Sequence, residues 1–377
     1  MNFLFACGGT GGHINPAVAA AQRLKALMPD CRCLFIGAED NMEMELVPKE
    51  GFPIRGVRVG NLHRSLKPAE TLHNLKSAGM VLTSIAAAKK IIREFQPDVV
   101  LGTGGYVCFP VLRAASMLGV PTLLHEANAC PGLTTRMLER HTDRMLVAFE
   151  EGKAGYRSPE RVLTVGMPVR TGFREQSRNA ARRSLGLDER PFVLSFGGSL
   201  GAKKLNEAVA HLAAENEKTG AFHLMHATGG GEAGFTAMQS RIRELGVTDL
   251  KHTELKPYIY NMAEVMAAAD LILCRAGAST LGEVCAVGRA AILVPYPYAT
   301  GNHQEKNAAL CASAGGAVLL RDGDCTPEAL MREVTRLCED PALLREMGAK
   351  LKALDRPDSL DCIVNEALRL AENKKQS

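Results

Sequence analysis

Short apolar runs alternate with amphipathic stretches along the first half of the chain. The apolar runs are predicted to be strands, at residues 2–7, 32–37, 98–102, 121–126 and 144–149. They lack an alternation of polar and apolar positions, which is typical of strands buried on both faces of a parallel sheet. The amphipathic stretches are predicted to be helices, at 16–28, 72–95 and 109–118. Pro16 suits a first helical turn, so we expect the first helix to begin there.

The second half of the chain repeats this pattern after a polar, charge-rich stretch at 174–190. Its predicted strands are at 192–196, 222–228, 250–253, 271–274, 291–296 and 317–321. The two halves also open alike, with FLFACGGTGGHINPAVAAA at 3–21 and VLSFGGSLGAKKLNEAVA at 193–210. Strands that alternate with helices predict parallel sheets covered by helices. We therefore expect an α/β protein of two Rossmann-like parallel-sheet domains that face a cleft.

Composition agrees with two folded domains and excludes several classes of protein. The chain has 377 residues, of which 46% are hydrophobic, and a net charge of +4, too small a surplus to indicate nucleic-acid binding. Its 11 cysteines form no CxxC pair, which favours free thiols in a reducing compartment. The amino terminus lacks the features of a signal peptide, and no apolar run is long enough to span a bilayer. We expect a cytoplasmic protein that can lie against a membrane.

Three glycine loops, each between a predicted strand and a predicted helix, carry the candidate chemistry: Gly8–His13, Gly102–Tyr106 and Gly197–Ala202. Glycines let a ligand approach the backbone, and a helix amino terminus favours phosphate. Glycines that only make tight turns are the alternative for any single loop. None has the GxxxxGK[ST] spacing of nucleoside triphosphatases. Ile14 stands where a dinucleotide fingerprint requires its third glycine, which disfavours a nicotinamide-dependent oxidoreductase, although Glu39 and Asp40 could imitate its ribose-binding acid.

Seven motifs in order resemble those of the MurG family, the peptidoglycan glycosyltransferases that add N-acetylglucosamine to lipid I to form lipid II. They are GGTGGHINPA, GTGGYV, HEANACPG, GMPVR, GGSLGA, CRAGASTLGE and NHQEKNA. The resemblance implies a glycosyltransferase B fold with an acceptor-binding, membrane-associating domain at 1–168 and a UDP-N-acetylglucosamine-binding domain at 169–357. It also implies a final helix at 358–377 that packs back on the first domain.

The resemblance assigns the donor to a defined set of residues. Glu283 would accept hydrogen bonds from the ribose hydroxyls, for which a carboxylate is the acceptor-only group, and Gln304 would contact the sugar hydroxyls. The backbone of Ile259 would contact uracil. The remaining donor residues would be Thr10, Gly11, Gly12, Asn128, Arg170, Ser199, Ala278, Ser279 and Thr280. An acid that stabilises a helix dipole is the alternative for Glu283, and a surface ion pair is the alternative for Arg170.

The acceptor and the catalytic base are assigned to the first domain. Gly104, Gly105 and Tyr106, with His13, would hold the acceptor diphosphate. The resemblance also implies a reaction that inverts the anomeric carbon, in which a base takes the proton of the muramyl 4-hydroxyl. His13 is the candidate because an imidazole can accept a proton at neutral pH. Glu126 and His125 are rival bases, and a histidine that only hydrogen-bonds the loop or the acceptor is the alternative.

The leaving UDP requires charge stabilisation, which the helix after Ser199 and Arg170 could supply. No DxD-like carboxylate pair stands beside the donor motifs. We therefore expect no obligatory metal ion and no cofactor.

The resemblance also implies a peripheral location on the cytoplasmic face of the plasma (inner) membrane, because lipid I is anchored there. Basic and apolar residues interleave at 64–93, which suits contact with anionic lipid. They are Arg64, Lys67, Lys76, Lys89, Lys90 and Arg93, with Leu72, Leu75, Met80, Val81, Leu82 and Ile85, against the single acid Glu70. An ordinary amphipathic helix packed on the sheet is the alternative. Cell-wall synthesis, cell shape and cell division are the implied processes, and other cell-wall synthesis proteins are the implied partners.

Three positions depart from the family pattern. Met167 stands where the family usually has Asn, Ala127 where it has Gln, and Cys108-Phe109 where it has Ser-Gly. These departures concern the fine positioning of acceptor and sugar. The alternative functions are a glycosyltransferase with a diacylglycerol acceptor, the oxidoreductase considered above, and a non-catalytic scaffold that binds a sugar nucleotide.

Overall fold

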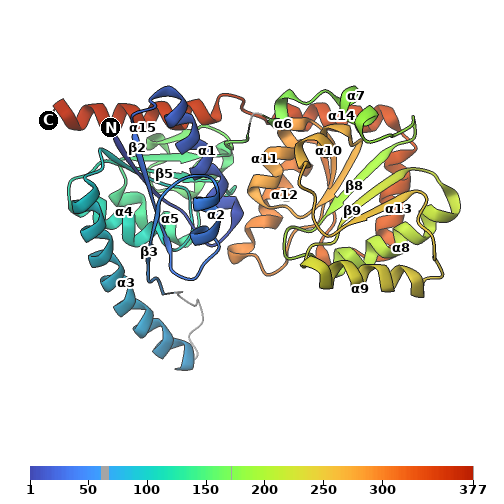
Figure 1. The fold of residues 1–377 in the computed structure, drawn as a ribbon, viewed down its shortest axis with the longest axis horizontal. Helices are drawn as coiled ribbons and strands as arrows, with labels where there is room; N and C mark the ends of the chain where they lie inside the picture. Colours follow the sequence, from blue (N-terminus) through green and yellow to red (C-terminus); the bar gives the residue numbers. More distant parts are fainter. Residues whose placement is uncertain (61–67, 171, 377) are drawn as a thin grey trace. The chain divides into compact units, whose positions relative to one another are not determined.

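The computed structural model describes residues 1–60, 68–170 and 172–376, leaving aside the side chains of 68–78, 300, 375 and 376. The chain divides into two compact units, each built around its own parallel sheet (Figure 1). Unit 1 consists of Met1–Val169 and Arg356–Ser377, and unit 2 consists of Arg170–Asp355. The predicted fold class of two parallel-sheet α/β domains is confirmed.

The sheet of unit 1 has seven parallel strands in the order β3-β2-β1-β4-β5-β6-β7. They are β1 (Asn2–Ala6), β2 (Arg32–Ala38), β3 (Ile54–Val57), β4 (Val99–Gly102), β5 (Thr122–Glu126), β6 (Arg144–Val147) and β7 (Val162–Thr164). Its helices are α1 (Gly11–Leu27), α2 (Glu43–Lys49), α3 (Pro68–Phe95), α4 (Cys108–Met117), α5 (Leu133–Leu138) and α15 (Ser359–Gln376).

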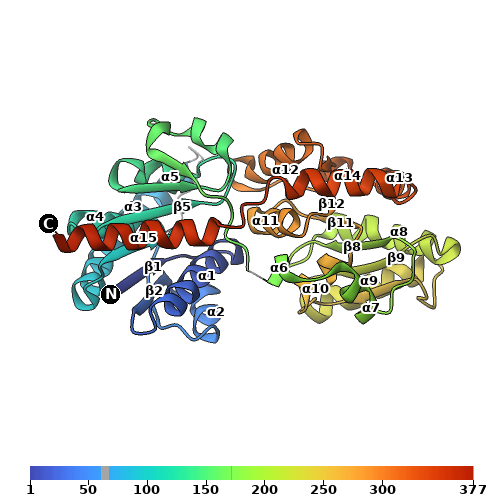
Figure 2. The same cartoon turned by 90° about the horizontal axis from the view of Figure 1, so that it is seen from above.

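Both faces of this sheet are covered, as uninterrupted apolar strands require. On one face, Phe3, Phe5 and Phe35 of the sheet pack with residues of α1 and α15. Figure 2 shows α15, from the end of the chain, lying along the sheet of unit 1 beside α1. On the other face, Leu4 and Ile36 pack with α3, α4 and α5. The last helix therefore completes the core of the unit that the chain begins with.

The sheet of unit 2 has six parallel strands in the order β10-β9-β8-β11-β12-β13. They are β8 (Phe192–Phe196), β9 (His223–Ala227), β10 (Thr253–Lys256), β11 (Leu271–Cys274), β12 (Ala290–Leu293) and β13 (Ala317–Leu319). The helices are α6 (Gly172–Glu175), α7 (Arg178–Ser184), α8 (Lys203–Thr219), α9 (Gly231–Glu244), α10 (Met262–Ala268), α11 (Ala278–Val287), α12 (His303–Ser313), α13 (Pro327–Cys338) and α14 (Pro341–Lys352). Apolar residues of α8, α9, α13 and α14 form the core on one face of the sheet.

Several predicted boundaries are wrong. The first helix begins at Gly11, so Pro16 lies inside it, and the strand predicted at 250–253 lies at Thr253–Lys256. Strands β3 and β7 were not predicted, because each is a short edge strand with exposed or half-buried positions that break the apolar run. The predicted membrane residues Arg64 and Lys67 lie outside the described residues, as do the side chains of Glu70, Leu72, Leu75 and Lys76.

Candidate active site

The residues assigned from the sequence follow the carboxyl ends of the strands in both sheets. In unit 1, Thr10–His13 follow β1, Gly104–Tyr106 follow β4, and Glu126 ends β5 two residues before Asn128. Strand order reverses between β1 and β4 in unit 1 and between β8 and β11 in unit 2. Ligands of doubly wound sheets bind beyond the carboxyl ends of the strands at such a reversal. The topology therefore gives each unit one expected binding edge.

The unit 2 residues meet the same condition. They follow four of its strands: Ser199 after β8, Ile259 after β10, Ala278–Thr280 and Glu283 after β11, and Gln304 after β12. Arg170 is the first residue of the unit.

The first two glycine loops, 8–13 and 102–106, are in direct contact. Gly104 and Gly105 have φ of +118° and +91°, a region that favours glycine. A Cβ at Gly104 would lie 2.4 Å from His13 Cδ2, and a Cβ at Gly105 would lie 2.3 Å from the Gly8 carbonyl oxygen. These glycines are therefore required so that the second loop can lie flat against the first.

His13 lies in the first turn of α1 with its imidazole against Gly104. Its Nδ1 lies 3.0 Å from the Gly8 carbonyl oxygen and 3.4 Å from Thr10 Oγ1. A carbonyl oxygen can only accept a hydrogen bond, so Nδ1 carries the proton in the neutral ring and Nε2 carries the lone pair. Thr103 Oγ1 donates to the His13 carbonyl oxygen at 2.6 Å and ties the two loops together.

Glu43, on α2, contacts the first glycine loop, and the sequence analysis missed it. Its side chain is fully buried, and its carboxylate accepts hydrogen bonds from Gly9 N at 3.0 Å and Ala38 N at 2.9 Å. A Cβ at Gly8 would lie 2.2 Å from Glu43 Oε1. Glu43 shares the buried face of α2 with Val47. In the sequence, an acid on the apolar face of this short helix was the signal that could have identified Glu43.

Glu126 is largely buried and organises the loop that carries Asn128. Its Oε1 accepts from Asn128 N and Nδ2, both at 3.0 Å, and its Oε2 accepts from Gly132 N at 3.0 Å and Thr135 Oγ1 at 2.6 Å. All four hydrogen bonds use the two carboxyl oxygens as acceptors. This geometry favours a loop-positioning role for Glu126 over the role of base.

His125, the other rival base, is completely buried in β5. Its Nε2 bonds to the Gly166 carbonyl oxygen at 2.9 Å, and burial lowers the pKa of its imidazole. Its burial and its bond to Gly166 disfavour a role as the base.

Cys108, one of the departures, is buried beneath the second loop. Its Sγ donates toward the carbonyl oxygens of Ala6 and Gly104, both at 3.1 Å, and Gly104 N donates to it at 3.3 Å. Burial raises the pKa of this thiol to about 12, so it stays neutral. The thiol thus anchors the Gly104 turn by hydrogen bonds that a hydroxyl could also make.

In unit 2, the third glycine loop at 197–202 packs against a fourth, Thr228–Gly231, which the sequence analysis did not single out. Gly230 N donates to the Ser199 carbonyl oxygen at 3.0 Å, and a Cβ at Gly229 would lie 2.3 Å from Gly201 N. The ATGGGE stretch at 227–232, where the predicted strand 222–228 ends, was the visible signal. Ser199 is exposed at the tip of the third loop.

Helix α8 follows this loop and has no acidic residue in its first turn, where Lys203 and Lys204 stand. Two cations at the positive end of a helix dipole are unfavourable unless an anion is present. The combination is typical of a phosphate site.

Glu283 lies in the second turn of α11, whose first turn is Ala278–Thr280. Burial raises the pKa of its carboxyl to about 7, against the opposing effect of the positive charge of Arg170. Arg170 itself is exposed, with its guanidinium 5.6 Å from the centre of the Phe173 ring. The structure therefore brings Arg170 and Glu283 within electrostatic reach of each other.

Gln304 and Ile259 are held by their own loops. Gln304 Oε1 accepts a hydrogen bond from Tyr296 N at 2.9 Å. The amide nitrogen of Gln304 therefore points away from Tyr296 N and can donate to another group. The Ile259 side chain is buried, 2% exposed, between the exposed Tyr258 and Tyr260. Anchoring by the side chain leaves the backbone of Ile259 as the part available to a ligand.

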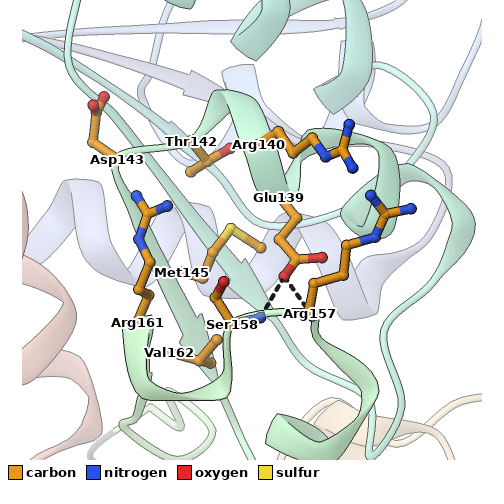
Figure 3. A pocket seen from close by; sticks show the side chains of 9 residues that line it. All are labelled: Glu139, Arg140, Thr142, Asp143, Met145, Arg157, Ser158, Arg161 and Val162. Atoms are coloured by element: carbon orange, nitrogen blue, oxygen red, sulfur yellow. Dashed lines mark hydrogen bonds between the residues drawn. The ribbon is translucent and has the colours of Figure 1, made fainter.

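Two cavities of unit 1 lie at the opposite edge of its sheet, where strands begin. One, of about 240 Å³, is lined by residues around the start of β6 and β7, among them Arg140, Arg157 and Arg161 (Figure 3). Its Glu139 accepts from Arg157 N and Ser158 N. The other, of about 690 Å³, lies around the start of β2 and β3. Neither contains a residue assigned from the sequence.

Within residues 1–60, 68–170 and 172–376, no group of three or more His, Cys, Asp or Glu side chains is arranged to hold a metal ion. None of the helices in this described part is long and apolar enough to cross a membrane.

Comparison with known proteins covers nearly the whole chain. The amino-terminal and carboxy-terminal domain models of glycosyltransferase family 28 match residues 3–147 and 192–362. A UDP-N-acetylglucosamine--N-acetylmuramyl-(pentapeptide) pyrophosphoryl-undecaprenol N-acetylglucosamine transferase of Desulforudis audaxviator is 41% identical over 374 residues, covering 98% of this chain and 99% of its own. The same enzyme of Acetivibrio thermocellus is 38% identical over 99% of both chains.

Solved structures give the same result for the fold. The crystal structure of Acinetobacter baumannii MurG matches with a TM-score of 0.78 and 29% identity over 98% of this chain and 99% of its own. The UDP-GlcNAc 2-epimerase of Neisseria meningitidis matches with a TM-score of 0.67 over 98% of this chain and 100% of its own, but at 15% identity, which shows a shared fold alone.

Proposed function

The chain belongs to glycosyltransferase family 28, and we propose that it transfers N-acetylglucosamine from UDP-N-acetylglucosamine to lipid I. Lipid I is the undecaprenyl-diphosphate-linked N-acetylmuramyl-pentapeptide, and the products are lipid II and UDP. The observation that carries the proposal is the full-length similarity to transferases named for this reaction, at 41% and 38% identity. The family match disfavours the oxidoreductase alternative, since both domain models are those of a glycosyltransferase.

We assign the donor to the carboxyl edge of the unit 2 sheet. The diphosphate would lie at the third glycine loop and the amino terminus of α8, where exposed Ser199 and the basic first turn favour an anion. The ribose hydroxyls would donate to Glu283, and the backbone of Ile259 would contact uracil. Gln304 would donate its amide N–H groups to the sugar, since its oxygen is engaged by Tyr296 N.

The acceptor belongs to unit 1 in this proposal. The contact of the first two glycine loops presents backbone groups of Gly104 and Gly105 beside exposed Tyr106, a suitable cradle for a diphosphate. Thr10, Gly11, Gly12 and Asn128 would reach the donor sugar from this unit. Glu126 would fix the Asn128 loop by its four hydrogen bonds.

His13 would be the general base. With Nδ1 donating to Gly8, the lone pair of the neutral ring is on Nε2, the atom that would accept the proton of the muramyl 4-hydroxyl. The hydroxyl oxygen attacks the anomeric carbon, the bond from that carbon to UDP breaks, and the configuration inverts. Charge on departing UDP would be stabilised by Arg170 and the α8 amino terminus, with no obligatory metal ion.

Because lipid I lies in the cytoplasmic leaflet, the protein would act at the cytoplasmic face of the plasma membrane. Support comes from α3: Met80 is 37% exposed and Leu82 is 70% exposed, and Lys90 and Arg93 are also exposed. Apolar and basic side chains on one exposed helix suit an anionic bilayer surface. Ser84, Ala88, Ile91 and Ile92 are buried, so this helix also packs on its sheet as the alternative interpretation expected.

The decisive assay supplies purified protein with UDP-N-acetylglucosamine and a lipid I analogue, and measures UDP release. We expect release that depends on the analogue and a disaccharide product linked to it. Equal release with a diacylglycerol in place of the analogue, or no sugar transfer at all, would overturn the assignment of the acceptor or of the reaction.

A further inference from the structure

The peptide unit that joins Gly8 to Gly9 makes a hydrogen bond to a side chain at each end. Its N–H, from Gly9, donates to Glu43 Oε2 at 3.0 Å, and its C=O, from Gly8, accepts from His13 Nδ1 at 3.0 Å. We propose that Glu43 acts on His13 through this single peptide, as a positioning residue that fixes the imidazole and raises its basicity. The catalytic consequence rests on the proposed role of His13 as base.

Burial and a second hydrogen bond fix the Glu43 carboxylate, which in turn fixes the peptide between Gly8 and Gly9. Glu43 is 0% exposed, and its second oxygen accepts from Ala38 N at 2.9 Å, at the end of β2. Gly8 and Gly37 pack against its side chain so closely that a Cβ at either would lie within 2.5 Å of it. The far side of the imidazole is fixed too, because Gly104 lies against the ring.

Hydrogen bonds in series strengthen one another. A carboxylate that accepts from a peptide N–H shifts electron density toward the carbonyl oxygen of the same peptide. That oxygen becomes a better acceptor for Nδ1–H, and the gain is larger when the ring is positively charged. The protonated form of His13 is therefore stabilised, and Nε2 becomes a stronger base. The proton taken from the muramyl hydroxyl stays on the imidazole, and none is transferred to Glu43.

Among the residues that the structure describes, the neighbouring thiols, Tyr106 and Glu126 do not supply the same effect. Cys7 and Cys108 lie beside Glu43, and burial raises the pKa of each thiol, so both are neutral. Tyr106 follows Gly105 in the second loop and is 45% exposed to water. Glu126 is engaged by the four donors of its own loop. Glu43, in contrast, reaches the first loop by a direct hydrogen bond from Gly9 N.

The test measures His13 directly by NMR on the full-length protein labelled with ¹⁵N. In the unaltered protein, we expect Nδ1 to carry the proton in the neutral ring. The Gly9 amide resonance should titrate with the same midpoint as the His13 ring. In Glu43→Gln the His13 pKa should fall by about one pH unit. The matched control Glu45→Gln removes an exposed carboxylate from the same helix and should leave the His13 pKa unchanged.

Kinetics supply the catalytic readout. The acid limb of the kcat/KM profile should move to lower pH with the His13 pKa in Glu43→Gln, with a fall in kcat of about tenfold and little change in the KM for UDP-N-acetylglucosamine. If Glu43→Gln does not fold, a Gly9 amide in the unaltered protein that fails to follow His13 would still overturn the inference.

Two results would overturn the inference: a Gly9 amide that does not follow His13, or a His13 pKa that is the same in Glu43→Gln and Glu45→Gln. Failure of the proposed function gives a different pattern. The His13 pKa would then still shift in Glu43→Gln, but the kcat/KM profile of the unaltered protein would not follow it.

Discussion

Arg174 and Asp355 join the two chain segments at which unit 2 begins and ends. The guanidinium donates to both carboxylate oxygens, from Nε at 3.0 Å and from Nη2 at 2.7 Å, and the Asp355 side chain is only 3% exposed. Burial alone would raise the pKa of Asp355, but the hydrogen bonds and charges of Arg174 and Lys352 lower it. The pair therefore stabilises unit 2 at neutral pH, and its contribution is lost as the pH falls through the acid range.

Replacing this arginine should destabilise unit 2. Arg174→Met leaves Asp355 buried without its main partner, and the free energy of unfolding should fall by about 3 kcal/mol at pH 7. Urea denaturation followed by circular dichroism measures the change. Lys350→Met, which removes an exposed pair with Glu346, is the control and should cost less than about 1 kcal/mol. An Arg174→Met protein as stable as the control would contradict this account.

A side chain at Gly104 should disable the acceptor loops and leave the donor unit intact. In Gly104→Ala, the new Cβ would lie 2.4 Å from Cδ2 of the His13 ring. Alanine would also have to adopt the φ of +118° at this position, which strains its backbone. We expect kcat/KM to fall by about a hundredfold or more, because the imidazole must move. UDP affinity, measured by calorimetry, should stay within about twofold. Gly323→Ala, where a Cβ has open space, should behave like the unaltered protein.

Glu283 should lower stability as its carboxyl ionises. Its pKa in the folded protein is about 7, raised by burial from an ordinary value of 4.5. A raised folded pKa means that the folded state binds more protons, so stability falls as the pH rises from about 4.5 through 7. Glu283→Gln removes this cost and should be more stable than the unaltered protein by up to about 3 kcal/mol at pH 8, with no difference at pH 4.

The same variant should bind UDP more weakly, because an amide offers the ribose hydroxyls one acceptor oxygen in place of two. Thermal unfolding at pH 4 and pH 8, with and without UDP, measures both effects. If Glu283 were only an acid stabilising a helix dipole, Glu283→Gln would lose stability at pH 8 and keep its affinity for UDP.

Removal of divalent ions should leave the reaction intact. In the proposed mechanism, Arg170 and the amino terminus of α8 stabilise the departing UDP, so an excess of EDTA should change kcat by less than about twofold. Arg170→Ala should lower kcat by about a hundredfold under the same conditions. Activity that EDTA abolishes and magnesium restores would refute the metal-independent mechanism.

The exposed face of α3 should bind anionic bilayers. Leu82→Ser removes an apolar side chain that is 70% exposed, and Lys90→Glu reverses a charge on the same helix. Co-sedimentation with phosphatidylglycerol vesicles should show about tenfold weaker binding for the double variant. Leu27→Ser, at the end of α1 and also exposed, is the control. Equal binding by all three proteins would mean that α3 serves only to pack on its sheet.

Local pattern predicted most of the strands and the glycine loops, because a strand buried on both faces needs an uninterrupted apolar run. The pattern of apolar residues did not predict the elements that need no uninterrupted apolar run. Edge strands β3 and β7 have exposed or half-buried positions. The first helix begins at Gly11, five residues before Pro16, so that part of the glycine loop is itself helical. The motifs pointed to Thr10, His13, Ser199 and Glu283, and the structure gives each of them a place at the carboxyl edge of a sheet.

The sequence by itself determined that two parallel-sheet halves exist and which loops carry glycine. Those features depend on residues that are neighbours along the chain. Only the tertiary structure decided that Glu43 reaches the 8–9 peptide, that Glu126 is engaged by its own loop, and that Glu283 is buried enough to hold its proton near neutral pH. The contacts of Glu43 with Gly9 and the burial of Glu283 arise between segments that meet only when the sheets form. The bonds of Glu126 reach no further than Thr135, but they require the conformation that this loop adopts in the folded protein. A local pattern of apolar and polar positions encodes neither.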